Sequence, residues 1–176
     1  MTSKKSCSII LIVFMLVMAC LLAGCAQEQA EKDLVVAVKS DIGSIEPDQM
    51  KQATFLVYQG LVTLEPNLNL APCLAVSWQA SAGGTEWTFN LRKGVKFHDG
   101  SEFKANDVKV SFERIMHEKG TSYWQENLVK IECPDEYTVK FALTKPNYLF
   151  PNLLTHYDSA IISDTALDAE GKIVKP

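Results

Sequence analysis

The chain has 176 residues, of which 47% are apolar and 22% charged, and this composition is typical of a globular protein with its own core. Its formal net charge is −4, from 17 basic and 21 acidic residues. Lys4 and Lys5 are the only charged residues before position 25, so residues 25–176 carry 15 − 21 = −6. Nucleic acid and anionic lipid both favour basic surfaces, so the charge argues against either as a partner.

The N-terminus has the features of an export signal. Lys4 and Lys5 precede an uncharged apolar run from Ile9 to Leu22. A positive segment, a short apolar segment and small residues before a cleavage point are typical of secretory signals. The run is shorter than the roughly 20 residues that span a bilayer comfortably. We therefore predict that residues 1–24 are a signal peptide.

The end of this signal, Leu22-Ala23-Gly24-Cys25, is similar to the lipobox of bacterial lipoproteins. The resemblance implies that Cys25 becomes the first mature residue and carries a diacylglycerol on its sulfur. Two or more acyl chains anchor a protein stably, so we expect an extracytoplasmic protein tethered to the cell membrane, in the periplasm or at the cell surface. An ordinary signal peptide with an incidental cysteine and an uncleaved anchor remain alternatives. Residues 25–32 are mostly polar and suit a flexible tether.

A strand, a loop and a helix are predicted next. The apolar run Leu34–Val38 favours a strand buried on both faces. Residues 40–48 hold glycine, proline and two aspartates, which predict a loop. Residues 49–59 predict a helix, with Phe55 and Tyr58 among the candidates for its inward face.

Alternating apolar residues predict two β-hairpins. The first turns at residues 82–85, where glycine can take a positive φ, and its expected inner face holds Leu74, Val76, Trp78, Trp87, Phe89 and Leu91. The second turns at residues 134–136, and its expected inner face holds Val129, Ile131, Cys133, Tyr137, Val139, Phe141 and Leu143. We interpret the aromatic residues as core rather than as a ligand site.

The segment between the hairpins fits either a strand or a helix. Val108, Val110 and Phe112 alternate as in a strand. The residues that instead fall on one face of a helix are Ala105, Val108, Phe112 and Ile115. Length and end signals favour the helix.

The end signals of this helix are unequal. Asn106 and Asp107 suit the positive end of a starting helix, and Gly120 offers a stop. Lys104 is a poor N-cap, which leaves the first residue open. Further along, residues 148–154 predict a helix and residues 160–162 a short strand.

The motifs of common enzymes are missing from the sequence. It contains no Gly-x-Ser-x-Gly elbow, no phosphate-binding GxxxxGK[ST] loop and no GxGxxG turn. His98, His117 and His156 stand in dissimilar contexts without metal-binding spacing. We predict that the protein is not an enzyme, although an exported hydrolase with a triad assembled from distant residues stays a competing hypothesis.

Two cysteines, Cys73 and Cys133, follow Cys25. A disulfide is possible in an extracytoplasmic compartment, but nothing in the sequence brings the two together, so we favour separate thiols. No CxxC or paired-histidine spacing indicates a zinc site.

His98-Asp99-Gly100 could be taken for a metal ligand or a catalytic dyad. It follows an alternating run, however, and Asp-Gly is a turn signal, because aspartate hydrogen-bonds the turn backbone and glycine tolerates positive φ. Lys93-Gly94 gives a first bend and His98-Asp99-Gly100 a second, between the hairpin and the helix. We predict a turn here, with no metal.

LAVSW followed by EWTFNLRKGVKFHDGSEFKANDVKVSFERI resembles the signature of the extracellular solute-binding proteins of ABC importers. The nearest group binds oligopeptides, dipeptides and nickel and is called family 5. The positions that match its pattern are Leu74, Ala75, Ser77, Trp78, Trp87, Phe89, 91–100, Phe103, Ala105, Asp107 and Val108. With the lipobox and residues 135–139, the resemblance extends over nearly the whole chain. Lys104 departs from it, because the family often has threonine or another capping residue there.

The resemblance implies an α/β fold. Residues 33–176 would be the N-terminal part of the first lobe of a two-lobe, class II periplasmic-binding-protein-like fold, a mixed sheet with hairpins and flanking helices. Family members are much longer than this chain, and their two lobes close on ligand about a hinge. We therefore expect most ligand contacts and the residues that separate peptide from nickel to lie beyond Pro176.

The implied function is the capture of a peptide, or of a nickel or metallophore complex, and its delivery to the permease subunits of an importer. No cofactor is implied, and the partners are ligand, permease and, through lipid, the membrane. The loop after the first strand borders the cleft in such folds, so Ile42, Gly43 and Ser44 are weak ligand-binding candidates. The alternative is a truncated, ligand-incompetent lipoprotein remnant or interaction module.

Overall fold

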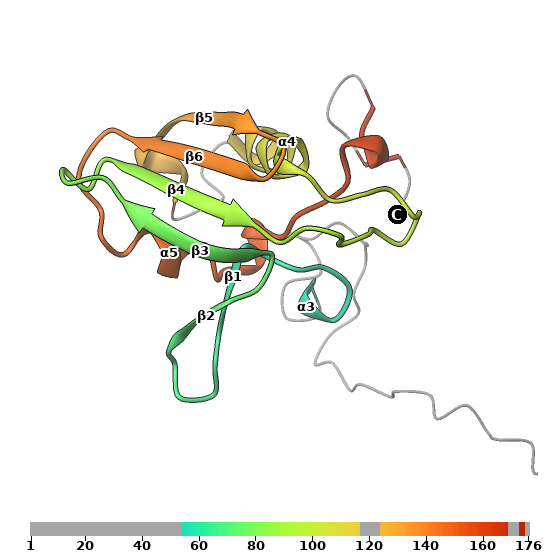
Figure 1. Ribbon diagram of the computed structural model, residues 1–176, viewed down its shortest axis with the longest axis horizontal. Coiled ribbons are helices and arrows are strands. Elements are labelled where there is room, and N and C mark those ends of the chain that lie inside the picture. The colour runs from blue at the N-terminus through green and yellow to red at the C-terminus, as the bar shows by residue number, and fades with distance from the viewer. Residues whose placement is uncertain (1–53, 117–123, 169–172, 175–176) are drawn as a thin grey trace, which may run out of the picture. The chain divides into compact units, whose positions relative to one another are not determined.

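The computed structural model describes residues 54–116, 124–168 and 173–174. Its centre is a four-stranded antiparallel sheet in the order β3-β4-β6-β5 (Figure 1). The strands are β3 (Ala75–Ala80), β4 (Glu86–Leu91), β5 (Leu128–Asp135) and β6 (Thr138–Leu143). Strands β3 with β4 and β5 with β6 form the two predicted hairpins, and the pairing of β4 with β6 joins them into one sheet.

Helix α4 (Ala105–Met116) packs against β5 and β6. A two-stranded hairpin, β1 (Val62–Leu64) with β2 (Leu70–Pro72), extends away from the larger sheet in Figure 1. The remaining elements are short: α3 (Thr54–Val57), η2 (Gln125–Asn127), α5 (Phe150–Leu153), η3 (Tyr157–Ser159) and η4 (Asp164–Ala166). The predicted α/β arrangement of hairpins and flanking helices is confirmed.

Aromatic side chains tie the sheet to the helices. Phe141 of β6 is fully buried, and its ring centroid lies 5.5 Å from Phe89, 5.1 Å from Phe112 and 5.4 Å from Phe150. Trp124 packs against Phe112 at 4.7 Å. Since burying one large apolar side chain contributes about 1.5–3 kcal/mol, this cluster is a main source of stability. The prediction that the aromatic residues of the hairpins belong to the core is confirmed for Phe89 and Phe141.

The prediction that Val76 and Val129 lie on the inner faces of the hairpins is wrong. They are 51% and 57% exposed. In each case the strand register shifts at that residue, between Ala75 and Ser77 and between Leu128 and Lys130. A β-bulge adds one residue without a partner, so alternation breaks there and buries the preceding residue instead. On β4 and β6, which pair with each other without a register shift, Phe89, Val139 and Phe141 are buried as predicted.

The helix between the hairpins is confirmed. Its predicted face of Ala105, Val108, Phe112 and Ile115 is at most 2% exposed. Of the helix predicted over residues 49–59, the described residues contain α3. The prediction that Phe55 faces inward is wrong, because its side chain is 48% exposed. The predicted tail helix holds the single turn α5, and the strand at 160–162 is reduced to one antiparallel bridge between Gln59 and Ile161.

Several predictions fall outside the described residues: the signal peptide, the tether, the strand at 34–38, the loop at 40–48 and the stop at Gly120. The prediction of a mixed sheet depends on that strand. In the described ranges every helix is too short or too polar to cross a bilayer.

Cys73 and Cys133 are unbonded to each other, as predicted, and both are half-buried. Burial raises the pKa of each thiol. Since the thiolate is the reactive form, the raised pKa argues against a nucleophilic role for either cysteine.

Candidate functional site

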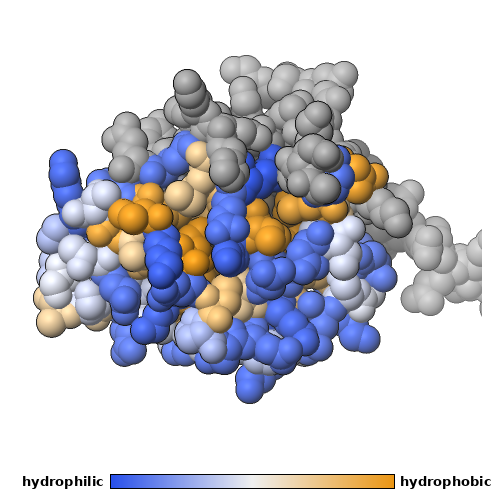
Figure 2. All heavy atoms as spheres, turned by 90° about the horizontal axis from the view of Figure 1, so that it is seen from above, coloured by the Kyte–Doolittle hydropathy of each residue, from blue (hydrophilic) through white to orange (hydrophobic). Residues whose placement is uncertain are grey.

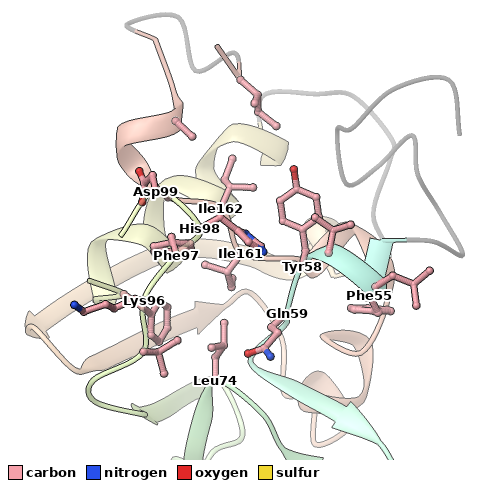
Figure 3. Close-up of a pocket in the computed structure, with 17 residues that line it drawn as sticks. Phe55, Tyr58, Gln59, Leu74, Lys96, Phe97, His98, Asp99, Ile161 and Ile162 are labelled. Atoms are coloured by element: carbon pink, nitrogen blue, oxygen red, sulfur yellow. The ribbon is translucent and has the colours of Figure 1, made fainter. Parts of the chain in front are cut away.

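A pocket of about 460 Å³ lies where α3, the segment before α4 and the segment after α5 meet (Figure 3). The volume is in the range of pockets that hold small organic ligands. Apolar side chains dominate its wall, with a few polar groups. The lining residues are Phe55, Leu56, Val57, Tyr58, Gln59, Leu74, Val95, Lys96, Phe97, His98, Asp99, Phe103, Ile161, Ile162, Ser163, Ala166 and Ile173.

The first wall of the pocket is the segment 96–99, which leads into the predicted turn at His98-Asp99-Gly100. Phe97 and Ser101 close it, since the Phe97 N–H donates to the Ser101 carbonyl at 2.9 Å and the Gly100 N–H donates to Phe97 at 3.0 Å. Gly100 has φ of 86°, which explains the glycine. The turn is therefore confirmed. In Figure 3 His98 lies in the middle of the pocket view, beside Phe97 and Ile162, so the turn also presents an imidazole to the pocket.

The second wall is the segment 161–166. The Ile161 N–H donates to the carbonyl of Gln59 at 2.9 Å, and the Ile162 N–H donates to the Ser111 hydroxyl of α4 at 3.0 Å. The next bond comes from Asp164, whose N–H donates to Asp107 Oδ1 at 2.9 Å. Helix α4 thus holds the second wall through side chains.

Asp107 is the carboxylate at the centre of this arrangement. Its side chain also accepts a hydrogen bond from the Lys104 N–H at 2.7 Å, which caps the helix and offsets the poor N-cap. The residue is only 3% exposed. Burial raises the pKa of the Asp107 carboxyl, against the opposing effect of the two backbone N–H groups.

Hydroxyl groups bridge the two walls. Thr165 Oγ1 donates to Asp99 Oδ2 at 2.9 Å, and the hydroxyl oxygens of Ser101 and Ser163 lie 3.2 Å apart. Asp99 Oδ1 accepts from both the N–H and the hydroxyl of Ser101, at 2.9 and 2.6 Å. The hydrogen bonds from the Ser101 side chain and backbone and from Thr165 hold the pKa of Asp99 below its usual value. The Asp99 carboxylate thus lies at the pocket rim with both oxygens accepting hydrogen bonds from Ser101 and Thr165.

The floor of the pocket is buried and apolar, whereas the α3 side is open. Leu74, Phe103 and Ile161 are at most 4% exposed. Phe55, Leu56 and Val57 of α3 line the pocket and are 48%, 57% and 46% exposed. Apolar side chains also show at the surface among hydrophilic ones on the face seen in Figure 2. Such a site can hold a small organic ligand through its apolar part while the rim contacts polar groups.

The described residues contain no group of three or more His, Cys, Asp and Glu side chains that could hold a metal ion. His98 is exposed at the rim beside a single carboxylate residue, Asp99. The apolar and polar side chains that line the pocket in the described part can contact an organic ligand.

The predicted site residues are distributed unevenly. Cys25, Ile42, Gly43 and Ser44 lie outside the described residues. Ser163 and Thr165 were missed by sequence reasoning, because they stand 62 and 66 residues after their partners Ser101 and Asp99. Asp107 was recognised in the sequence only as a residue at the start of the helix. Its hydrogen bond to the second wall was not predicted.

Comparison with known proteins finds relatives that are named or solved as ligand-binding proteins. The glutathione-binding protein GsiB of Shigella flexneri is 39% identical over 161 residues, which cover 86% of this chain and 31% of the relative. NikZ from Campylobacter jejuni, solved with Ni(L-His), is 32% identical with a TM-score of 0.69, covering 78% of this chain and 29% of NikZ. DppA from Helicobacter pylori, solved with the peptide STSA, is 31% identical with a TM-score of 0.61. The match covers 69% of this chain and 29% of DppA.

The chain thus spans about a third of the length of the curated relatives that it matches. Residues 69–176 match the family model described as bacterial extracellular solute-binding proteins, family 5, middle region. The chain belongs to the bacterial extracellular solute-binding proteins of family 5.

Proposed function

We propose that the protein is an extracytoplasmic substrate-binding lipoprotein of an ABC importer that captures small peptides for the membrane permease. The observation that carries the proposal is the 39% identity to a glutathione-binding protein over 86% of this chain. A relative solved with a tetrapeptide supports the same ligand class. Nickel or a metallophore complex remains the second ligand class, because another relative was solved with Ni(L-His).

The capture mechanism follows from binding linkage. A ligand that contacts a closed arrangement better than an open one shifts the population toward the closed form, which the permease can then recognise. In the described part, the pocket walls at 96–99 and 161–166 supply contacts to the ligand, and their hydroxyl bridge keeps them in register. ATP hydrolysis belongs to other subunits of the importer.

The proposal includes the membrane anchor. Residues 1–24 act as a lipoprotein signal peptide, Cys25 carries the lipid, residues 25–32 are the tether, and residues 33–176 form the N-terminal part of the first solute-binding lobe. Ile42, Gly43 and Ser44 remain proposed ligand contacts. This arrangement places the protein outside the cytoplasmic membrane, held there by its acyl chains.

Isothermal titration calorimetry tests the ligand class. The protein from Cys25 to Pro176 is titrated with glutathione, with the peptide STSA and with Ni(L-His), after circular dichroism has verified that it is folded. We expect saturable binding of a peptide with a dissociation constant below about 1 mM, which corresponds to roughly 4 kcal/mol. Binding of Ni(L-His) alone would replace the peptide class by the nickel class. No saturable heat with any of the three ligands would contradict ligand capture by residues 25–176 themselves and favour the ligand-incompetent interaction module.

A further inference from the structure

Helix α4 holds the second wall of the pocket through acceptors from two of its turns. Asp107 accepts the Asp164 N–H at 2.9 Å and Ser111 accepts the Ile162 N–H at 3.0 Å. Asn106 adds a third contact, since its Nδ2 donates to the Asp164 carboxylate at 2.8 Å. Asp107 and Ser111 are each 3% exposed, so water does not readily replace these bonds.

The second wall contains the short helix η4, and the residues before it, 161–163, are not part of a helix or strand. Within the part of the chain that the structure describes, its strand pairing is the single bridge between Gln59 and Ile161. The N–H groups of Ile162 and Asp164 are therefore held by side chains of α4 where a sheet would use a neighbouring strand. Since Ile162 and Ser163 line the pocket, a change in these bonds changes the shape of the site.

Helix capping alone does not account for the hydrogen bonds of Asp107 and Ser111 to the second wall. Capping the helix uses one carboxylate oxygen, Oδ2, on the Lys104 N–H. The second oxygen, Oδ1, serves the Asp164 N–H of the wall. Ser111 has no capping role, because it lies in the second turn of the helix, and its hydroxyl also donates to the Asp107 carbonyl at 2.6 Å. The hydroxyl is thereby oriented to accept from Ile162.

We infer that Asp107 and Ser111 are positioning residues of the pocket: they fix the backbone of Ile162 and Asp164 from α4 and so set the wall that ligand contacts. The inference rests on the proposed function for its effect on ligand affinity. Its structural part does not depend on ligand, because the hydrogen bonds can be measured in the free protein.

The test uses Asp107→Asn and Ser111→Ala, with Glu113→Gln on the same helix as the control. The two N–H groups bond to different carboxylate oxygens, and asparagine replaces one of these oxygens by an NH2 group that cannot accept, so it cannot serve both N–H groups in this geometry. Glu113 pairs with Lys109 within the helix, at 3.9 Å, and does not line the pocket. Amide hydrogen exchange and amide chemical shifts are measured by NMR on residues 25–176, and glutathione affinity is measured by calorimetry on the same samples.

We expect exchange at Ile162 to accelerate at least about tenfold in Ser111→Ala, and exchange at Asp164 similarly in Asp107→Asn, while amides of β4 and β6 keep their protection. Chemical shifts of His98 and Asp99 across the pocket should move in both variants. Glutathione affinity should fall about tenfold, with Glu113→Gln unchanged throughout. A residue that only stabilises the fold would instead change the protection of β4 and β6 together with that of the wall.

Unchanged exchange at Ile162 and Asp164, or unchanged affinity despite accelerated exchange, would overturn the inference. If Asp107→Asn loses protection across the whole sheet, Ser111→Ala decides, because it removes only the hydroxyl. If the wild-type protein binds no glutathione, the peptide proposal loses that support, whereas the exchange and chemical-shift results still decide whether α4 positions the wall.

Discussion

Leu68, in the turn between β1 and β2, adopts a backbone conformation that is unfavourable for its side chain. Its φ is 66°, and it is 75% exposed. The left-handed region costs a residue with a Cβ roughly 1–2 kcal/mol, and asparagine tolerates it better than leucine. We expect Leu68→Asn to raise the free energy of unfolding by about 1 kcal/mol in urea titrations. Leu64→Asn is the control, because Leu64 of β1 is 42% exposed and its φ is not positive; an equal gain there would refute the strain explanation.

Asp99, also at the residue scale, makes a pH-dependent contribution to stability. Hydrogen bonds from Ser101 and Thr165 lower the pKa of its carboxyl in the folded state. A group with a depressed folded pKa stabilises the protein above its unfolded pKa of about 3.9, and this contribution is lost as the pH falls through the folded value. Urea unfolding from pH 6 to pH 2 should therefore show the gap between wild type and Asp99→Asn narrowing below about pH 4. A gap that is constant with pH would show that the charge does not contribute.

The β3–β4 hairpin, at the scale of elements, depends on one of its two adjacent glycines. Gly84 has φ of 63°, and a Cβ there would lie 2.9 Å from the ring of Tyr148, whereas a Cβ on Gly83 would meet nothing closer than 3.7 Å. The exposed Tyr148 ring can move, so the backbone dominates the expected loss of about 1–2 kcal/mol for Gly84→Ala. Gly83→Ala should cost clearly less. Equal losses, measured by chemical denaturation, would mean that the turn conformation is not limiting.

Elements with a clear period could be predicted from the sequence, and those interrupted by bulges could not. The faces of β4, β6 and α4 follow simple alternation or helical spacing, and Phe89, Val139 and Phe112 are buried as that spacing indicates. Val76 and Val129 broke the pattern because a bulge is decided by the partner strand, which a single strand's sequence does not contain. The same limit applies to the pocket: the bond from Thr165 to Asp99 joins residues 66 positions apart.

Considered as a whole molecule, the described part joins one aromatic core to one pocket through α4. Phe112 of this helix packs into the core on Phe141, while Asp107 and Ser111 hold the pocket wall. Core packing and ligand contact therefore share a rigid element, which is the arrangement that keeps a binding site in a defined shape. The family signature at residues 91–108 covers the first wall and the start of α4, so the residues that identify the family also build this side of the pocket.

The most direct measurement of ligand capture by this pocket is a titration of ¹⁵N-labelled residues 25–176 with glutathione and with the peptide STSA, followed by NMR. Saturating shifts with a shared dissociation constant are predicted for the amides of His98, Asp99, Ile162 and Ser163, which belong to the two walls. The amide of Leu68, at the tip of the β1–β2 hairpin, should not move. Saturation without shifts at these wall residues, or no shifts with either peptide, would contradict peptide capture by this pocket.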